Sequence, residues 1–268
     1  METRVELDTP YRLEAADVAA FAEQGFIKLP QVASAELIDA CQPEITREMA
    51  EHAAEQPPLS ERDTYGRAFL QSTNLWQRSE TIRELVFASR FAQLAAELLG
   101  VDGVRLYHDQ ALYKEPGGGF TPWHCDQHYW PLATDRCCTL WLPLQPTPLE
   151  MGPLTFAAGS HRVDLGRSLP ISDASESELD RALAGTPIVQ QPYASGEASF
   201  HLGRVFHRAA ANTTAAPRRV MTVIYIDADM TIAEPRNENQ KADLTSWFPG
   251  ARPGQVPDTP LNPVLFRA

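Results

Sequence analysis

A histidine and an aspartate stand two residues apart, at His124 and Asp126, in a segment rich in strand-forming residues. Residues two apart on a regular strand point to the same face, so this imidazole and this carboxylate can reach one metal ion. Two imidazoles and one carboxylate around iron(II) leave open positions for O₂ and an oxo-acid, as in non-haem oxygenases. A His-x-Asp tripeptide alone is weak, because it is common by chance. The prediction therefore needs a third ligand and a co-substrate site.

Both requirements are met later in the chain, where His207 is followed eleven residues on by Arg218. This spacing fits a late strand, a turn and the next strand, which would place the arginine deep in a barrel. A planar guanidinium binds a carboxylate through two parallel N–H groups. That suits the distal carboxylate of 2-oxoglutarate, whose other end chelates the metal. Arg219, one residue on, is expected to face the opposite side of the strand.

With these residues in place, the chain resembles the phytanoyl-CoA dioxygenase family of iron(II)/2-oxoglutarate enzymes over about residues 17–226. The segments that carry the resemblance are, in chain order, Gly25-Phe26 with Leu29-Pro30, Tyr113-Lys114 before Pro116-Gly117, Trp123-His124-Cys125-Asp126 with His128-Tyr129-Trp130-Pro131, Trp141-Leu142-Pro143-Leu144, Gly152-Pro153-Leu154, Ala158-Gly159-Ser160-His161, and His207 with Asn212 and Arg218. Each match alone is weak, but their common order and spacing are specific.

The resemblance implies an iron(II), 2-oxoglutarate and O₂-dependent dioxygenase that releases succinate and CO₂. It implies that His124, Asp126 and His207 are the catalytic metal ligands. The residues implied for the co-substrate pocket are Arg218, Gln110, Trp141 and His108, although Gln110 and His108 fit a purely structural role equally well. Because related halogenases have a small residue at the carboxylate position, Asp126 favours hydroxylation. Desaturation, epoxidation, ring closure and epimerisation stay open, because they follow the same hydrogen abstraction.

Other residues near these motifs have weaker claims to function. Tyr113, His128 and Trp130 are candidates for a substrate pocket, and the aromatic pair Tyr129-Trp130 fits core packing about as well. His128 is expected to form a pocket wall or to support the ligands from behind rather than to be a fourth ligand. We expect Cys125 to pack away from the metal, and His161 and His201 to be structural.

The patterning around these motifs predicts a mainly β fold with α, a double-stranded β-helix (jelly-roll or cupin-like) core with an N-terminal helical layer. Helices are expected over 15–24, from Ser34 to about residue 56, and over 89–99. Short strands between Gly/Pro turns are expected over 104–114, 120–123, 138–144, 154–156, 199–201 and 219–226. The acidic segment 172–184 is expected to be a solvated helical insertion or a lid.

The whole chain, 1–268, is predicted to be one catalytic domain, with a helical part to about residue 100, a core over 101–230 and a tail over 231–268. Its net charge of −12 and pI near 5.0 argue against nucleic acid or an anionic membrane as a partner. We see no secretory-type start and no apolar run of membrane-spanning length. The four cysteines are expected to be reduced thiols. These features predict a cytoplasmic monomer or homodimer.

The substrate class follows only loosely from the sequence. Aromatic residues near the site favour a small, largely apolar or polycyclic molecule, such as a natural-product intermediate of secondary metabolism. Two alternatives remain at this point: a cupin-type metal enzyme that does not use 2-oxoglutarate, and a non-catalytic binding protein on the same fold. The role of Arg218 distinguishes the predicted 2-oxoglutarate enzyme from the first alternative. The intact set of three ligands argues against the second alternative.

Overall fold

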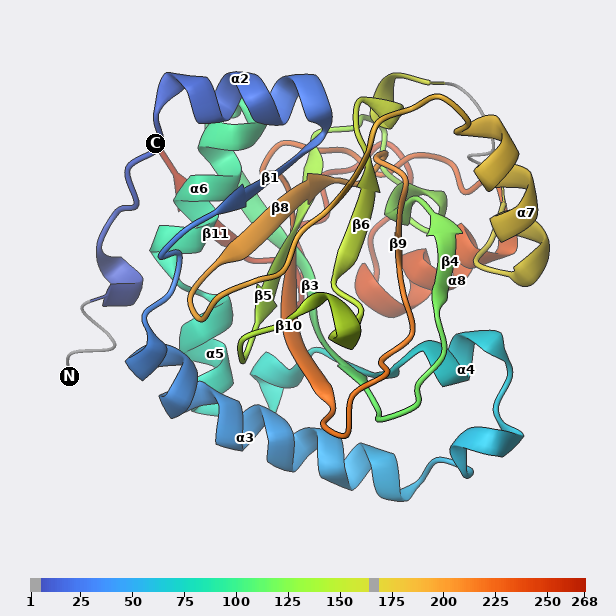
Figure 1. Cartoon of the computed structure of the whole chain (residues 1–268). Helices are drawn as coiled ribbons and strands as arrows, with labels where there is room; N and C mark the ends of the chain where they lie inside the picture. The colour runs from blue at the N-terminus through green and yellow to red at the C-terminus, as the bar shows by residue number, and fades with distance from the viewer. Residues whose placement is uncertain (1–5, 164–168) are drawn as a thin grey trace.

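Two antiparallel sheets form the core of the computed structural model, which describes residues 6–163 and 169–268 (Figure 1). The larger sheet has the order β1 (Phe26–Leu29), β8 (Ala198–Leu202), β5 (Cys137–Pro143), β10 (Arg218–Asp227), β3 (Gly103–Lys114) and β11 (Val264–Arg267), and β2 (Leu70–Thr73) also pairs with β3. The smaller sheet has the order β4 (Thr121–His124), β9 (His207–Ala209), β6 (Leu154–Ala157) and β7 (Ile188–Gln190). The predicted jelly-roll class is confirmed.

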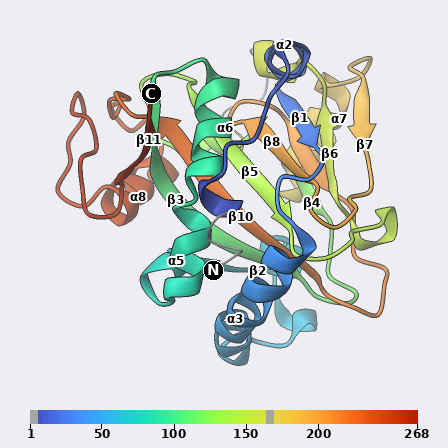
Figure 2. The same cartoon turned by 90° about the vertical axis from the view of Figure 1, so that its left-hand side faces the viewer.

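An N-terminal helical layer covers the outer face of the larger sheet (Figure 2). Its main members are α2 (Ala15–Gln24), α3 (Ala35–Ala54), α5 (Glu80–Val86) and α6 (Ser89–Leu99). Helix α6 packs against β3, β5, β10 and β11, and its buried residues join the largest hydrophobic cluster. The predicted helical layer is therefore confirmed, and it leaves the other face of this sheet free to line a cavity.

Local sequence signals account for the ends of these helices. The Ser34 hydroxyl accepts a hydrogen bond from the Leu37 N–H and so caps α3, as predicted. Gly25 follows α2 with a φ of +83° and donates its N–H to the Phe21 carbonyl, a left-handed ending that favours glycine. Gly100 ends α6 in the same conformation. The chain therefore turns from helix to strand where its sequence predicts.

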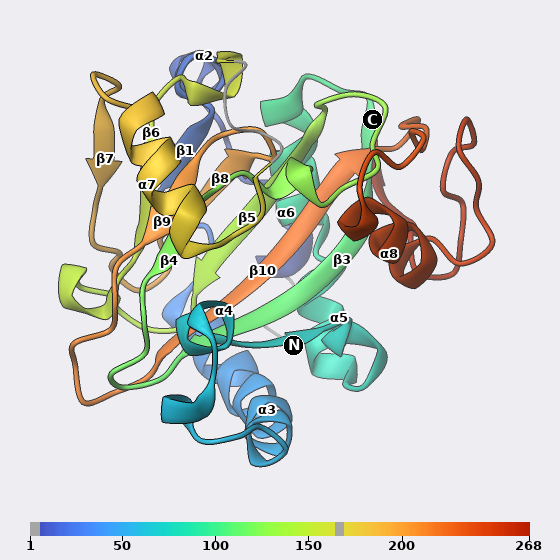
Figure 3. The ribbon, with the colours of Figure 1, turned by 90° about the vertical axis from the view of Figure 1, so that its right-hand side faces the viewer.

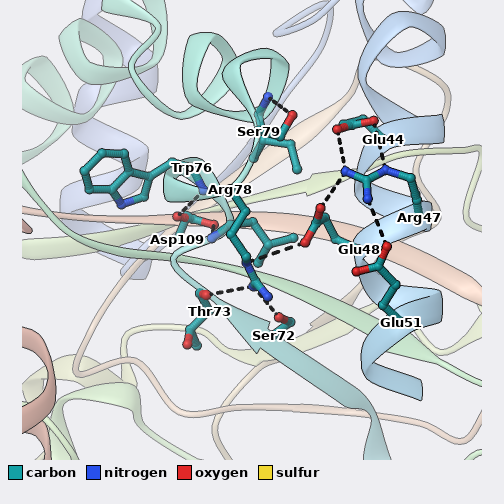
Figure 4. Close-up of polar contacts among 12 residues, drawn as sticks. Glu44, Arg47, Glu48, Glu51, Ser72, Thr73, Trp76, Arg78, Ser79 and Asp109 are labelled. Carbon is teal, nitrogen blue, oxygen red and sulfur yellow. Dashed lines mark hydrogen bonds and ion pairs between the residues drawn. The ribbon is translucent and has the colours of Figure 1, made fainter. Parts of the chain in front are cut away.

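A polar network joins the helical layer to β2 and β3 (Figure 4). The buried Asp109 carboxylate accepts hydrogen bonds from the backbone N–H groups of Leu75, at 3.0 Å, and Trp76, at 3.4 Å. Arg78 donates to the Ser72 hydroxyl at 2.7 Å and pairs with Glu48 of α3 at 3.5 Å. These bonds hold β3, which carries part of the pocket wall, against the helices behind it.

Two further helices flank the sheets on opposite sides in Figure 3, where β10 and β3 are visible between them. Helix α7 (Asp173–Ala182) confirms the helix predicted over 172–184, and it packs against β4. Helix α8 (Glu238–Trp247) and strand β11 lie within the segment 231–268, for which the sequence predicts only a tail. These two elements were not predicted, because α8 is weakly amphipathic and its placement depends on contacts with distant segments. The short elements β2, β7, α4 (Thr64–Ala68) and α5 were also not predicted.

Within the described part of the chain, no helix is both long enough and apolar enough to cross a membrane.

Candidate metal centre and co-substrate pocket

Three side chains from different elements converge on one point between the sheets. His124 is the last residue of β4, Asp126 begins a 3₁₀ turn (Asp126–His128), and His207 begins β9. Asp126 Oδ1 lies 3.7 Å from His124 Nε2 and 3.6 Å from His207 Nε2. Two atoms that each bind one ion at about 2.1 Å lie no more than about 4.2 Å apart, so these separations fit a single ion. In the described residues this is the one such group of His, Cys, Asp or Glu.

The expectation that His124 and Asp126 share one regular strand was wrong, although the two side chains do converge. Strand β4 ends at His124, and the backbone turns at Asp126. Antiparallel pairing places His124 directly opposite His207, and their rings lie 4.2 Å apart between centroids. The third ligand position therefore comes from strand pairing, and the turn brings the Asp126 carboxylate close to the Nε2 atoms of both rings.

Backbone carbonyls fix the orientation of both imidazoles. His124 Nδ1 lies 2.8 Å from the Pro122 carbonyl oxygen, and His207 Nδ1 lies 3.2 Å from that of Val205. A carbonyl can only accept, so each Nδ1 carries the proton and each Nε2 presents its lone pair to the centre. This arrangement is typical of histidines that bind metal ions.

The Asp126 carboxylate is held from its other side. Thr139 Oγ1 donates to Oδ2 at 3.1 Å, and His201 Nε2 lies 3.2 Å from the same oxygen. Oδ1, which faces His124 and His207, is left for an ion. The sequence prediction of a merely structural His201 was wrong: β8 turns this buried side chain into the pocket, against the carboxylate.

The protonation states suit a metal ion. Burial lowers the pKa of His124, and burial followed by the neighbouring His124 lowers the pKa of His207 well below its usual value. Burial alone would raise the pKa of Asp126, but His207, His201 and His124 outweigh it and hold that pKa below its usual range. At neutral pH the centre thus offers two neutral imidazoles and one carboxylate, which is the donor set that iron(II) oxygenases use.

A cavity of about 440 Å³ opens onto this centre. Both sheets contribute to its wall, and α4 and α8 contribute at its rim. Residues that line the cavity besides the three candidate ligands include Tyr65, Phe69, His108, Gln110, Tyr129, Trp130, Trp141, Arg218, Asp243 and Trp247. Its size is in the range of small-molecule sites.

Arg218 fits the predicted role of an anion-binding residue. The side chain is 2% exposed, its Nη1 donates to the Gly152 carbonyl, and its guanidinium carbon lies 5.4 Å from the centre of the Trp141 ring. Its Nε, and the Nε1 of Trp141, have no hydrogen-bond partner among the described residues. No described carboxylate forms an ion pair with Arg218. A buried guanidinium with unpaired donors in a cavity wall is suited to a carboxylate of a bound molecule.

The remaining predicted residues differ in which face of their strand they occupy. On β3, Gln110 and His108 point into the cavity, whereas Tyr113 faces the helical layer and contacts the Thr46 hydroxyl at 2.9 Å. Gln110 and Tyr113 lie three residues apart in a regularly paired part of β3, so alternation places their side chains on opposite faces, and assigning Tyr113 to the pocket was an error. Arg219, as expected, points away and donates to Gln145.

His128 lies outside the cavity wall too. It is buried, its carbonyl accepts hydrogen bonds from Asn237 and Gln240, and its Nε2 lies 3.2 Å from Asn239 Nδ2. This histidine therefore anchors α8 rather than forming a pocket wall. Trp130 does line the cavity. Cys125 packs with Trp123, as expected of a residue directed away from the centre.

Several residues of the cavity wall were not predicted from the sequence. Tyr65 and Phe69 come from α4 and its end, and Asp243 and Trp247 come from α8. Both segments are polar and weakly patterned. The spacing of Asp243 and Trp247, four residues apart, would have placed them on one helix face had the helix been recognised.

Comparison with known proteins agrees with this geometry. The family model described as phytanoyl-CoA dioxygenase (PhyH) matches residues 21–220. A zebrafish (Danio rerio) phytanoyl-CoA dioxygenase domain-containing protein 1 is 30% identical over 138 residues, which cover 47% of this chain and 46% of that relative. The ectoine dioxygenase of Streptomyces avermitilis is 24% identical over 249 residues, covering 85% of this chain and 83% of that enzyme.

Solved structures extend the likeness over nearly the whole chain. The epimerase SnoN in complex with Fe³⁺, alpha ketoglutarate and nogalamycin RO is 25% identical, with a TM-score of 0.75 over 94% of this chain and 98% of SnoN. The carbocyclase SnoK from nogalamycin biosynthesis is 25% identical, with a TM-score of 0.73 over 96% of this chain and 99% of SnoK.

Proposed function

The chain belongs to the phytanoyl-CoA dioxygenase family of iron(II)- and 2-oxoglutarate-dependent enzymes, and on that premise we propose that it hydroxylates a small, largely apolar molecule with release of succinate and CO₂. The observation that carries this proposal is the pairing of two features in one cavity. One is the convergence of His124, Asp126 and His207, and the other is the buried guanidinium of Arg218, whose Nε has no hydrogen-bond partner among the described residues.

In this proposal each residue has a stated task. His124 and His207 bind iron(II) through Nε2, because their Nδ1 atoms are engaged with backbone carbonyls. Asp126 binds through Oδ1, while Thr139 and His201 hold Oδ2 in place. When bound, iron and 2-oxoglutarate supply the oxidising chemistry, which activates O₂ and converts 2-oxoglutarate to succinate and CO₂.

Arg218 binds the distal carboxylate of 2-oxoglutarate and so sets the orientation of the co-substrate. Burial lowers the pKa of Arg218 to about 10, so the guanidinium is still charged at neutral pH. Trp141, whose ring lies beside this guanidinium, closes that end of the cavity to water. Gln110 and His108 line the wall nearby.

The aromatic part of the cavity wall favours an apolar substrate. It includes Tyr65, Phe69, Tyr129 and Trp130. Such walls bind flat or polycyclic molecules through apolar contact and exclude water from the reacting atoms. The relatives SnoN and SnoK, which belong to the biosynthesis of nogalamycin, support a natural product as substrate.

The test is succinate formation. Purified protein with iron(II), 2-oxoglutarate and O₂ is incubated with a panel of polycyclic natural products, and also with free amino acids and acyl-CoA esters. We expect succinate in equal amount to a product 16 mass units heavier, or to an epimer or ring-closed product, for a polycyclic compound. The Asp126→Ala variant serves as the inactive control. Coupled turnover of amino acids or acyl-CoA esters alone would contradict the proposal.

A further inference from the structure

A second carboxylate, outside the metal centre, lies in the wall of the same cavity. Asp243 projects from α8, and together with Asp126 it accounts for the carboxylates in the described wall. It is not part of the group that can hold a metal ion. Helix α8 lies beyond residue 220, where the match to the family model ends. Asp243 therefore lies outside the part of the chain that the family model matches.

The hydrogen bonds to Asp243 come from neutral groups. Tyr107 donates its hydroxyl to Oδ2 at 2.6 Å, and Trp247, four residues on along α8, donates its indole N–H. A carboxylate has about four acceptor positions, so these two donors leave others for a ligand. Over residues 6–163 and 169–268, no lysine or arginine forms an ion pair with it.

The surroundings of Asp243 are aromatic. Trp247 lines the cavity, with its ring 4.8 Å from that of His108, and Tyr107 packs 5.3 Å from Trp130. Tyr65 and Tyr129 line the same cavity, and the charge of Asp243 contributes to raising the pKa of each, after burial. Burial in this setting raises the pKa of Asp243 to about 6.

A carboxylate without a cationic partner, among aromatic rings in a substrate-sized cavity, is the environment that binds an organic cation. The carboxylate supplies charge and a hydrogen-bond acceptor, and ring faces attract a positive nitrogen. A desolvated position strengthens both interactions. A neutral hydroxyl group on a ligand would use only the hydrogen-bond acceptor and not the charge of the carboxylate.

We infer that Asp243 is a specificity-determining residue that binds a protonated amine on the substrate. The substrate class is thereby an apolar, ring-containing molecule with a basic nitrogen, seated with the nitrogen at α8 and the rest of the molecule toward the metal centre. This inference rests on the proposed function for the identity of the reaction, but amine binding itself does not require turnover.

The experiment measures binding to protein that holds iron(II) and 2-oxoglutarate without O₂. The probes are N,N-dimethyl-1-naphthylmethylamine and its carbon analogue 1-isobutylnaphthalene, which share shape and differ in charge. Dissociation constants are read from the fluorescence of the tryptophans. We expect wild-type protein to prefer the amine by about tenfold or more, and Asp243→Asn to lose that preference.

Two further variants serve as controls. Glu238→Gln removes a carboxylate from the same helix at an exposed position, where the side chain is 87% exposed, and is expected to keep the amine preference. Tyr107→Phe removes one donor but leaves the carboxylate, and is also expected to keep the preference.

Equal affinity of wild-type protein for the two probes overturns the inference, and this result needs no variant to fold. An Asp243→Asn variant that keeps the preference overturns it as well. The visible absorption of the iron(II)–2-oxoglutarate complex, at about 500 nm, is recorded in the same samples. If that absorption is missing, the proposed function fails; if it is present and the amine preference is missing, only the role of Asp243 fails.

Discussion

Replacement of Arg218 by methionine tests whether this residue binds the co-substrate. Methionine fills a similar volume in a buried position and has no N–H donor. Arg218 is 2% exposed, and its hydrogen bond within the described chain goes to the Gly152 carbonyl. The variant therefore removes a cation from the cavity wall without opening the helical layer or the metal centre.

The expected loss of 2-oxoglutarate affinity follows from the N–H donors of Arg218 that are available to a ligand. Its Nε has no partner, and Nη1 is already engaged with Gly152. Hydrogen bonds to charged groups contribute about 1.5–3 kcal/mol each, so two bonds to a carboxylate correspond to about 3 kcal/mol or more. The dissociation constant of 2-oxoglutarate is expected to rise by about 100-fold or more. The free energy of unfolding should change by no more than about 2 kcal/mol, because the lost Gly152 bond is offset by relief of a buried charge.

The assay is anaerobic titration of 2-oxoglutarate into iron(II)-loaded protein, followed by calorimetry and by the visible absorption. The matched control is Arg219→Met, one residue on, whose side chain faces away and binds Gln145. We expect wild-type affinity for the control. Unchanged 2-oxoglutarate affinity in Arg218→Met, with iron still bound, would refute this role of Arg218. It would favour the alternative of a cupin-type metal enzyme that does not use 2-oxoglutarate.

Three other predictions concern the centre and its supports. Asp126→Ala is expected to abolish turnover and to eliminate the rise in melting temperature that iron(II) produces in wild-type protein. For the wild type, an iron(II) concentration of 100 times the dissociation constant adds about 2.7 kcal/mol to the free energy of unfolding. Scanning calorimetry with and without a chelator measures the difference. Gly152→Ala is expected to weaken 2-oxoglutarate binding and to unfold at lower denaturant concentration, because an added Cβ would lie 2.2 Å from the Ala210 carbonyl oxygen at a φ of +69°. Lys114 is buried, and burial followed by the nearby Arg218 lowers its pKa from 10.5 to about 6. Between these two pH values lysine is protonated in the unfolded chain but not in the folded one, so the free energy of unfolding of wild-type protein should rise with pH relative to that of Lys114→Met, by up to about 1.4 kcal/mol per pH unit. Urea unfolding at pH 7 and 9.5 measures the difference. The same pH dependence of the free energy of unfolding in both proteins would contradict the prediction.

Local residue patterns determined much of this protein in advance. Gly25 after the first predicted helix, Ser34 before the second, and the apolar spacing within each helix predict bounds that agree closely with those observed. The order of short strands and turns predicts the jelly-roll. The spacing of His124, Asp126 and His207 with Arg218 indicates the family, because a family motif is written in the sequence itself.

Tertiary structure decided the features that depend on pairing between distant segments. Local periodicity placed Asp126 on a strand, whereas the chain turns there and strand pairing brings His124 opposite His207. Asp126 is held by His201, 75 residues away in sequence, a contact that no local pattern encodes.

The pocket shows the same division. Strand alternation, once the register of β3 is known, assigns Gln110 to the cavity and Tyr113 to the helices. The weakly amphipathic α8 acquires its place through hydrogen bonds to the backbone of His128, and only this docking brings Asp243 to the cavity. The sequence by itself thus determined the class of chemistry, because ligand types and their spacing are local. The shape and charge of the substrate site were decided by the fold, because they arise from side chains that are distant along the chain.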